Sequence, residues 1–359
     1  MKKFLALALA LIMMLAVSAP ALAAQDAYVF WYTFGDVYLS SVREATETAM
    51  KAEGLNPIHQ DANGQQATQT DQINTALVSG ASAIVINMCE SGSIGVAETL
   101  LNAVKAYDLP CVFFNRALST NDDEVKALLS TYEKSVFIGT VFDEAGKMQG
   151  DMIGQYVLDN YDAIDLNKDG VITYVMFKGD EANQEAILRT QYGVENADAI
   201  LTANGKPALK FYDESNASKY LVDLNGTWSN TASFEYMQTI LAQYNEANGN
   251  MVELVIANND DMALGAVNAL TVAGYNTGEE GAKVIPVFGV DATDAAKELI
   301  ANGRMVGTIK QDAVGMADAV SHITANLVNG KPMFEGLNES YGIIDNWMVT
   351  IPYGMYTGE

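Results

Sequence analysis

The sequence predicts an α/β protein made of two doubly wound lobes, each built on a parallel sheet. Short apolar runs alternate with longer amphipathic runs along most of the chain, which is typical of parallel sheets covered by helices on both faces. The crossover between successive parallel strands is nearly always right-handed, so each sheet is expected to be doubly wound. The length of 359 residues suits two domains of roughly 150 residues each.

Strands are expected where short runs of apolar, β-branched and aromatic residues occur. These runs cover residues 27–34, 83–88, 111–115, 135–138, 171–177, 208–212, 253–257, 283–290 and 305–309. Helices are expected in the amphipathic stretches between them, at residues 38–53, 65–79, 93–106, 143–160, 184–203, 230–247, 261–273, 293–302 and 313–329. The boundary between the lobes is expected near residues 140–143, although the composition marks it only weakly.

Residues 1–23 have the pattern of a signal peptide and are not expected to belong to the fold. Lys2 and Lys3 form a basic start, residues 4–17 form an apolar run, and residues 21–23 read Ala-Leu-Ala, a small-residue cleavage pattern. The apolar run is shorter than the ~20 residues that a membrane span needs. The mature chain is therefore expected to be exported, in the periplasm or otherwise outside the cytoplasm.

The chain is strongly acidic. Its 20 Lys and Arg residues and 45 Asp and Glu residues give a formal net charge of −25. Nucleic acids and anionic membrane surfaces both need a basic patch, so neither is an expected partner. Repulsion between such charged molecules favours a monomer.

Amide and carboxyl side chains gather where the expected strands end. Asn115, Asn259 and Asp291 are examples, and ligands of open α/β sheets bind beyond the carboxyl ends of the strands. The alternative is that such residues are helix N-caps, and this is the preferred interpretation for Asp260 and Asp312. The set as a whole is too rich in Asn, Gln and Asp to consist of caps alone.

This set of side chains suits a neutral ligand that is rich in hydroxyl groups. Amides donate and accept hydrogen bonds, and carboxylates accept them from hydroxyls. An aromatic ring can cover the apolar face of a pyranose, and Tyr32, Tyr38 and Trp228 are candidates for this role. The alternative for each of these three rings is a place in the hydrophobic core.

Residues 165–173 read D-L-N-K-D-G-V-I-T, which matches the opening of an EF-hand-type calcium loop. Oxygen ligands at alternate positions and a glycine at the sixth position suit Ca²⁺. The twelfth position is Met176 instead of the usual Glu, so a carboxylate from elsewhere must complete the site. The alternative is a metal-free Asx turn.

These residues together resemble the periplasmic galactose/glucose-binding proteins of bacterial ABC sugar importers. The most specific matching segments are V-F-F-N at 112–115, D-L-N-K-D-G at 165–170, V-I-A-N-N-D at 255–260 and P-V-F-G-V-D-A at 286–292. The resemblance covers essentially the whole mature chain. It implies the type I periplasmic binding protein fold, with two lobes joined by a three-strand hinge and the sugar between them.

The resemblance also implies the lobe boundaries and the site residues. The N-terminal lobe would comprise residues 26–140 plus 312–346, and the C-terminal lobe residues 141–311 plus 347–359. Tyr38 and Trp228 would cover the two faces of the pyranose, Asp36 would accept from its 4-hydroxyl, and Arg189 with Glu185 would hold the anomeric end. The full sugar-binding set would be Tyr32, Asp36, Tyr38, Asn115, Asn183, Glu185, Arg189, Trp228, Asn259, Asp291 and Gln311. Structural Ca²⁺ would be held by Asp165, Asn167, Asp169, the carbonyl of Val171, Thr173 and Glu253.

Several positions depart from the family pattern. Tyr38, Asn183, Glu185 and Gln311 stand where the family typically has Phe, His, Asp and Asn, respectively. These changes leave open the preference between glucose, galactose, another hexose and a glycoside. Thr173 replaces a Gln and can supply one oxygen fewer to the metal.

The function that the resemblance implies is capture of a monosaccharide of the glucose or galactose type and its delivery to the membrane subunits of an ABC transporter. Docking of the liganded form to a chemoreceptor is compatible with this role. The main alternative is an exported glycoside hydrolase in which Glu185 and Asp291 are the paired carboxylates. An enzyme is not expected, because both have a simpler role as hydroxyl acceptors and the sequence has no G-x-S-x-G or nucleotide-binding motif. A repressor ligand-binding domain shares the architecture, but the export signal opposes it.

Overall fold

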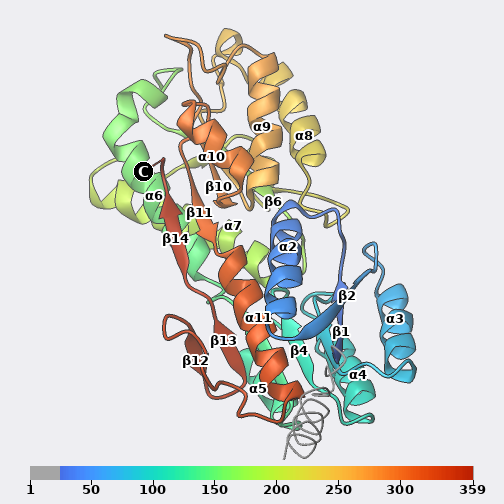
Figure 1. The fold of residues 1–359 in the computed structure, drawn as a ribbon. Helices are drawn as coiled ribbons and strands as arrows, with labels where there is room; N and C mark the ends of the chain where they lie inside the picture. Colours follow the sequence, from blue (N-terminus) through green and yellow to red (C-terminus); the bar gives the residue numbers. More distant parts are fainter. Residues whose placement is uncertain (1–24, 359) are drawn as a thin grey trace, which may run out of the picture.

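The chain folds into two α/β lobes, each built around a mostly parallel sheet (Figure 1). The computed structural model describes residues 25–358, so the expected signal peptide lies outside the described part of the chain. The fold class predicted from the sequence is confirmed. Within residues 25–358, no helix is both long enough and apolar enough to cross a membrane.

The first lobe contains a sheet with the strand order β12-β13-β5-β4-β3-β1-β2. All neighbouring strands run parallel except β12, which is antiparallel to β13. The strands are β1 (Gln25–Trp31), β2 (Leu55–Asp61), β3 (Ala83–Ile86), β4 (Cys111–Phe114), β5 (Ser135–Gly139), β12 (Gly342–Ile344) and β13 (Met348–Thr350). The helices are α2 (Val37–Ala52), α3 (Gln66–Val78), α4 (Ile94–Lys105), α5 (Asp122–Leu129) and α11 (Ala313–Val328).

The second lobe contains a sheet with the strand order β14-β11-β10-β9-β6-β7, and β8 also pairs with β6. The strands are β6 (Thr173–Lys178), β7 (Lys210–Phe211), β8 (Leu221–Val222), β9 (Leu254–Ala257), β10 (Val287–Asp291), β11 (Gly307–Gln311) and β14 (Tyr353–Tyr356). Only β14 is antiparallel, to β11. The helices are α6 (Glu144–Ile164), α7 (Gln184–Ala203), α8 (Asn230–Gln243), α9 (Asp260–Val272) and α10 (Asp294–Ala301), with a short 3₁₀ helix η1 (Glu246–Asn248).

Each sheet has a hydrophobic core on both of its faces, because alternate strand residues point to opposite sides. In β3, Val85 packs with α2 and α11, whereas Ile84 and Ile86 pack with α3, α4 and α5. In the second lobe, α6 and α7 cover one face and α8, α9 and α10 cover the other. Burial on both faces explains why these strands appear in the sequence as continuous apolar runs.

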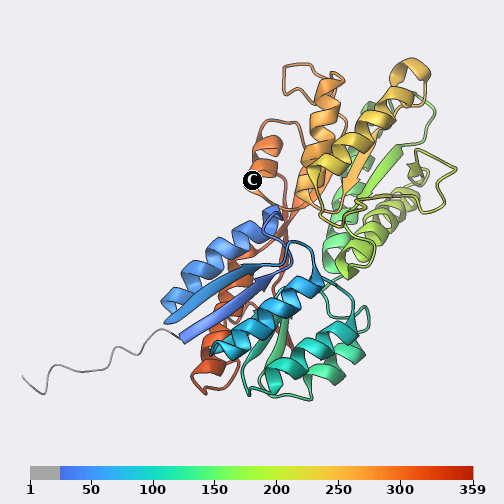
Figure 2. The same cartoon turned by 90° about the vertical axis from the view of Figure 1, so that its right-hand side faces the viewer.

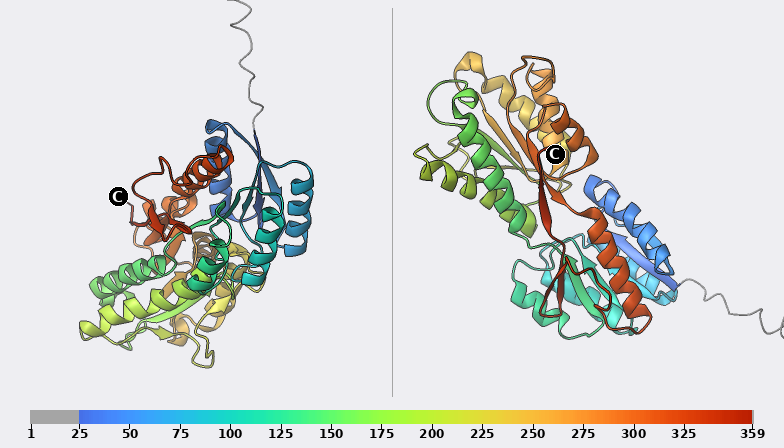
Figure 3. Two further views of the ribbon diagram at one scale, coloured as in Figure 1. Left: turned by 90° about the horizontal axis from the view of Figure 1, so that it is seen from below. Right: turned by 60° about the vertical axis from the view of Figure 1, so that its left-hand side comes forward.

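The chain crosses between the two sheets three times. The crossings lie at residues 140–143 after β5, at Asp312 after β11, and at residues 351–352 between β13 and β14. Figure 2 shows the two lobes side by side, and the right view of Figure 3 shows the C-terminal segment passing from one lobe to the other.

The last crossing lies later than expected. The resemblance implies that residues 347–350 belong to the C-terminal lobe, but β13 pairs with β5 in the first sheet, where Met348 aligns with Phe137. Trp347 is buried in the core between that sheet and α3, α4 and α5. This apolar segment therefore completes the first lobe before the chain crosses to β14.

Candidate functional site

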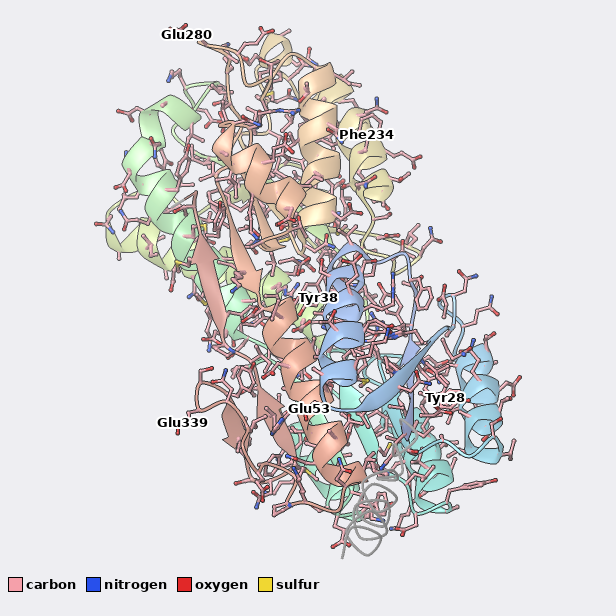
Figure 4. The ribbon with its side chains drawn as sticks, viewed as in Figure 1. Tyr28, Tyr38, Glu53, Phe234, Glu280 and Glu339 are labelled. Atoms are coloured by element: carbon pink, nitrogen blue, oxygen red, sulfur yellow. The ribbon has the colours of Figure 1, made fainter. Side chains whose placement is uncertain are left out.

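A polar cavity lies between the two lobes, at the carboxyl ends of their parallel strands. All eleven residues that the resemblance assigned to sugar binding lie around it. A twelfth lining residue, Arg116, was not expected there. In Figure 4, Tyr38 lies at the end of α2 that faces the second lobe. The lining residues are Tyr32, Asp36, Tyr38, Asn115 and Arg116 from the first lobe, and Asn183, Glu185, Arg189, Trp228, Asn259, Asp291 and Gln311 from the second.

Asp36 is fixed in the cavity as the N-cap residue of α2. Its carboxylate accepts a hydrogen bond from the amide of Leu39 at 2.9 Å and another from the hydroxyl of Tyr32 at 2.7 Å. Burial raises the pKa of Asp36, and these two hydrogen bonds oppose that shift. A carboxylate has about four acceptor positions, so Asp36 can still accept a hydrogen bond from a ligand hydroxyl.

Arg116 connects the two lobes at the edge of the cavity. Its guanidinium lies 4.2 Å from the centre of the Tyr32 ring. Its Nη2 donates to the carbonyl of Cys89 at 3.2 Å and to the carboxylate of Asp180, in the second lobe, at 3.0 Å. Both members of this ion pair are largely buried, so it is screened less by solvent than a surface pair.

The first turn of α7 carries a second charged group of residues. Glu185 accepts from the hydroxyls of Thr140 at 2.7 Å and Tyr353 at 2.8 Å. Arg189, one helical turn later, lies 3.3 Å from Glu185. It also donates to the side-chain oxygen of Gln311 at 3.1 Å. Burial alone would lower the pKa of Arg189, but Tyr353, Glu185 and Asp291 raise it, so the guanidinium stays charged.

Trp228 has its place because Gly179 leaves room for it. A Cβ atom on Gly179 would come within 2.0 Å of the Trp228 ring. The backbone of Trp228 is left-handed, with φ of 57°, and its carbonyl accepts from the side chain of Asn259 at 3.2 Å. Gly179 therefore lets the backbone approach the ring, and Asn259 holds the backbone of Trp228, while the ring lines the cavity with the Arg189 guanidinium 5.7 Å from its centre.

Asp291 is held in a strained conformation with φ of 122°. Behind it, Asp260 accepts hydrogen bonds from the amide of Thr293 at 2.7 Å and from the hydroxyl of Thr308 at 2.6 Å. The interpretation of Asp260 as an N-cap was wrong, because Asn259 caps α9 by accepting from the amide of Met262 at 2.9 Å. Asp260 is instead fully buried and fixes the turn that carries Asp291.

Burial changes the pKa of both Asp291 and Asp260. Burial raises the pKa of Asp291, and it raises the pKa of Asp260 to about 7. Asp312, the other expected cap, occupies the N-cap position of α11, but its side chain makes no capping hydrogen bond.

Four buried polar atoms around the cavity have no hydrogen-bond partner within the described residues. They are the Tyr38 hydroxyl, Nε of Arg116, Nε of Arg189 and Nε2 of Gln311. Burial raises the pKa of Tyr38, so its hydroxyl keeps its proton at neutral pH. All four atoms can therefore donate, and buried donors without partners are rare in proteins. The cavity is prepared for a ligand that supplies oxygen acceptors.

The cavity itself is narrow. Its volume is about 30 Å³, which is room for about two water molecules. A six-membered sugar ring needs more space than that. Because the lining comes from both lobes, a separation of the lobes would enlarge the cavity.

The loop at residues 165–173 is closed by hydrogen bonds within itself and with Glu253. Asp169 donates its amide to the side-chain oxygen of Asn167 at 2.9 Å, and Gly170 donates its amide to Asp165 at 3.1 Å. Glu253, fully buried before β9, accepts from the amide of Thr173 at 3.1 Å. The other carboxylate oxygen of Asp165 is buried and has no hydrogen-bond partner in the part of the chain that the structure describes.

These contacts hold Glu253 against the loop that contains the other expected calcium ligands. One carboxylate oxygen of Asp165 has no partner within residues 25–358, which fits a cation that binds oxygen ligands. The fit is incomplete. Over residues 25–358, no group of three or more His, Cys, Asp or Glu side chains is close enough together to hold a metal ion.

Comparisons with known proteins agree on the family. Residues 27–332 match the family described as "Periplasmic binding protein domain". The chain is 31% identical over 323 residues to the D-galactose/methyl-galactoside binding periplasmic protein MglB of Haemophilus influenzae, which covers 90% of this chain and 86% of that protein. It is 22% identical over 317 residues to the ribose import binding protein RbsB of Salmonella typhimurium, covering 88% of this chain and 89% of that protein.

A solved structure has a similar fold. The structure of an ABC transporter solute binding protein from Bacillus halodurans with bound myo-inositol superposes with a TM-score of 0.66 and 19% identity, and it covers 95% of this chain and 96% of that one.

The resemblance stated from the sequence is confirmed at the level of the family, while the hydrolase alternative finds no support. Glu185, one of its two carboxylates, is paired with Arg189 and with two hydroxyl donors. Members of the family bind solutes outside the cytoplasm and are not enzymes. The chain therefore belongs to the periplasmic binding protein family.

Proposed function

We propose that the protein captures a monosaccharide of the glucose or galactose type between its two lobes and delivers it to the membrane subunits of an ABC importer. One observation carries this proposal. Buried donors that have no partner within residues 25–358, carboxyl groups and three aromatic rings line a single cavity between the two lobes. This combination matches a neutral ring with hydroxyl groups at its rim and apolar C–H faces.

The charges of the cavity favour a neutral ligand over a charged one. Arg189 is paired with Glu185, and Arg116 is paired with Asp180. The carboxyl groups of Asp36 and Asp291 offer no positive charge to an anion, whereas hydroxyl groups can donate to their oxygens. An amine would find carboxylates, but it would leave the unpartnered donors of Arg189 and Gln311 without acceptors.

Binding and closure are coupled in this proposal. Tyr38 belongs to the first lobe and Trp228 to the second, so a ring can contact both only when the lobes are close together. A ligand shifts a conformational equilibrium by its difference in affinity for the two states. The closed form would then be the form that the membrane subunits distinguish from the empty, more open one. Periplasmic binding proteins are known for closing about a hinge around their ligands in this way.

The sugar class rests on the relative named for D-galactose and methyl-galactoside, which is the more similar of the two curated relatives described above. The other is named for ribose import. Tyr38, Asn183, Glu185 and Gln311 depart from the family pattern, so they are the residues expected to set the preference among hexoses.

A structural calcium ion is part of the proposal. Asp165, Asn167, Asp169, the Val171 carbonyl, Thr173 and Glu253 would hold it, and the ion would fix the loop that precedes β6. The unpartnered oxygen of Asp165 and the buried carboxylate of Glu253 support this assignment.

A panel of sugars tests the proposed function. D-Glucose or D-galactose should raise the melting temperature of the mature protein, and calorimetry should give a dissociation constant in the micromolar range or below. L-Glucose is the control, since it has the same groups with the opposite chirality. The absence of both a thermal shift and binding heat with either D-sugar would contradict the proposed sugar class.

A further inference from the structure

A second, larger cavity adjoins the proposed hexose site. Its volume is about 440 Å³, within the roughly 300–1,000 Å³ of ordinary ligand pockets. It too lies between the lobes. Tyr32 and Arg116 line both cavities, and Asp180, which pairs with Arg116, lines the larger one.

Both walls of this second cavity are firmly built. On the first lobe, Asp61 accepts from the amide of Asn63 at 2.8 Å, and Gly64 donates its amide to the carbonyl of Tyr32 at 2.6 Å. On the second lobe, the buried carboxylate of Asp223 accepts from the Thr227 hydroxyl at 2.9 Å. It also accepts from the amide of Asn225 at 3.0 Å and from Ser229, and so fixes the loop that ends at Trp228.

The lining offers neutral polar groups to a ligand. Asn63 and Asn225, one from each lobe, are both exposed to solvent, and their side-chain amides make no hydrogen bond within the described residues. Leu224, which also lines the cavity, is 84% exposed. The charged groups are already paired. Arg116 contacts Asp180, and Glu181 contacts Lys178 and the Tyr220 hydroxyl.

We infer that this cavity is a second subsite, which takes a neutral hydroxylated group, such as a second sugar unit, joined by a glycosidic oxygen to the hexose. The inference rests on the proposed function, and it makes the ligand a glycoside. Free amides from both lobes would bind the hydroxyl groups of the second unit, and Leu224 would cover an apolar face. The buried Nε of Arg116, which has no partner within the described residues, is a donor at the boundary where the linking oxygen would pass.

Calorimetry that compares monosaccharides with disaccharides tests the inference. The mature protein is titrated with D-glucose and D-galactose and with methyl β-D-galactopyranoside, lactose, melibiose, maltose and cellobiose. At least one disaccharide should bind within tenfold of the best hexose. If a hexose binds but no disaccharide does, the second subsite is refuted while the proposed function stands. If no sugar of either kind binds, both are refuted.

Two tryptophan substitutions then locate the second unit. Asn225→Trp should fill the cavity and weaken disaccharide binding at least tenfold, with hexose binding unchanged within twofold. Asn302→Trp is the matched control at an exposed asparagine at the end of α10, and it should change neither affinity. Equal loss of both sugars in Asn225→Trp, or no loss of the disaccharide, would overturn the inference.

Discussion

At the level of single residues, the cavity is distinguished by buried donors that have no hydrogen-bond partner within residues 25–358. Tyr38 is the clearest example, because the residue is 7% exposed and its hydroxyl has no partner among the described residues. A buried hydroxyl without a partner destabilises the ligand-free protein. A ligand that supplies a hydrogen-bond acceptor removes this destabilisation when it binds.

Tyr38→Phe should therefore weaken hexose binding by about fivefold to 150-fold, the equivalent of ~1–3 kcal/mol for one buried hydrogen bond. The unfolding free energy of the empty protein should not fall. Tyr132→Phe is the matched control, since that hydroxyl donates to the carbonyl of Leu109 at 2.9 Å, far along the first lobe. Calorimetry would decide, and an unchanged affinity in Tyr38→Phe would mean that the hydroxyl does not meet the sugar.

Trp228 supplies a ring face that no other residue of the second lobe replaces at this cavity. Trp228→Ala should weaken hexose binding more than tenfold, because the apolar face of the sugar loses its cover. Trp228→Phe should abolish most of the sugar-induced change in tryptophan fluorescence. Trp347→Phe, at a buried tryptophan of the first lobe, should leave both the affinity and the fluorescence change in place. Retained affinity in Trp228→Ala would remove this ring from the site.

Together with Asp291, whose pKa is also raised by burial, Asp260 should make the free energy of unfolding depend on pH. Burial raises its pKa to about 7 in the folded protein, from an ordinary value of 3.8. Between these values the folded protein binds more protons than the unfolded chain, so the unfolding free energy should fall as the pH rises from about 4 to about 7. Asp260→Asn should flatten this dependence in urea denaturation at pH 5 and pH 8. Asp71→Asn, on the exposed face of α3, is the control. An undiminished slope in Asp260→Asn would assign the pH dependence to other groups.

The residue types at the strand ends predicted several residues of the cavity, but they did not predict the role of Arg116. Asn115 and Asp291 follow apolar runs directly, so the place of each in the cavity could be anticipated. Arg116 is the next residue after Asn115, yet its role depends on Asp180 from the other lobe and on the Tyr32 ring beneath it. Those contacts form only in the folded protein.

At the level of elements, the sequence predicted the fully buried strands well because each is a continuous apolar run. β2 lies at the edge of its sheet, and after Leu55 its residues are only partly buried or exposed. It contains Pro57, and proline is typical of edge strands. It therefore lacks the apolar run that identifies a central strand.

Short elements were missed for a different reason. α5 has eight residues and buries only Val125 and Leu129, too few for a clear helical period. β12, β13 and β14 have three or four residues each. Their identity as strands depends on partners that are distant in sequence, such as Phe137 for Met348.

The proposed calcium site in the loop at residues 165–173 can be tested by adding and removing the metal. Added CaCl₂ should raise the melting temperature of the protein, and EDTA should lower it, because an ion that binds only the folded form stabilises that form. Glu253→Gln should reduce the calcium-dependent part of this shift, whereas Glu279→Gln, at an exposed site, should keep it. Equal melting temperatures in calcium and EDTA would mean that the loop is a metal-free turn.

At the level of the whole molecule, the three crossings between the sheets give the two lobes a common boundary at which they can move. The closed arrangement is stabilised by contacts across this boundary, including the Arg116–Asp180 ion pair and the hydrogen bond from the side chain of Asn183 to the Ser91 hydroxyl at 3.3 Å. The cavity of about 30 Å³ is too small for a sugar ring, so binding requires the lobes to separate and close again.

A crystal structure of the mature protein grown with D-galactose or D-glucose tests the central claim most directly. We expect density for one pyranose between the rings of Tyr38 and Trp228, with its hydroxyl groups in contact with Asp36, Glu185 and Asp291. A saturated crystal with no carbohydrate between the lobes, or with the sugar bound elsewhere, would contradict the proposed function.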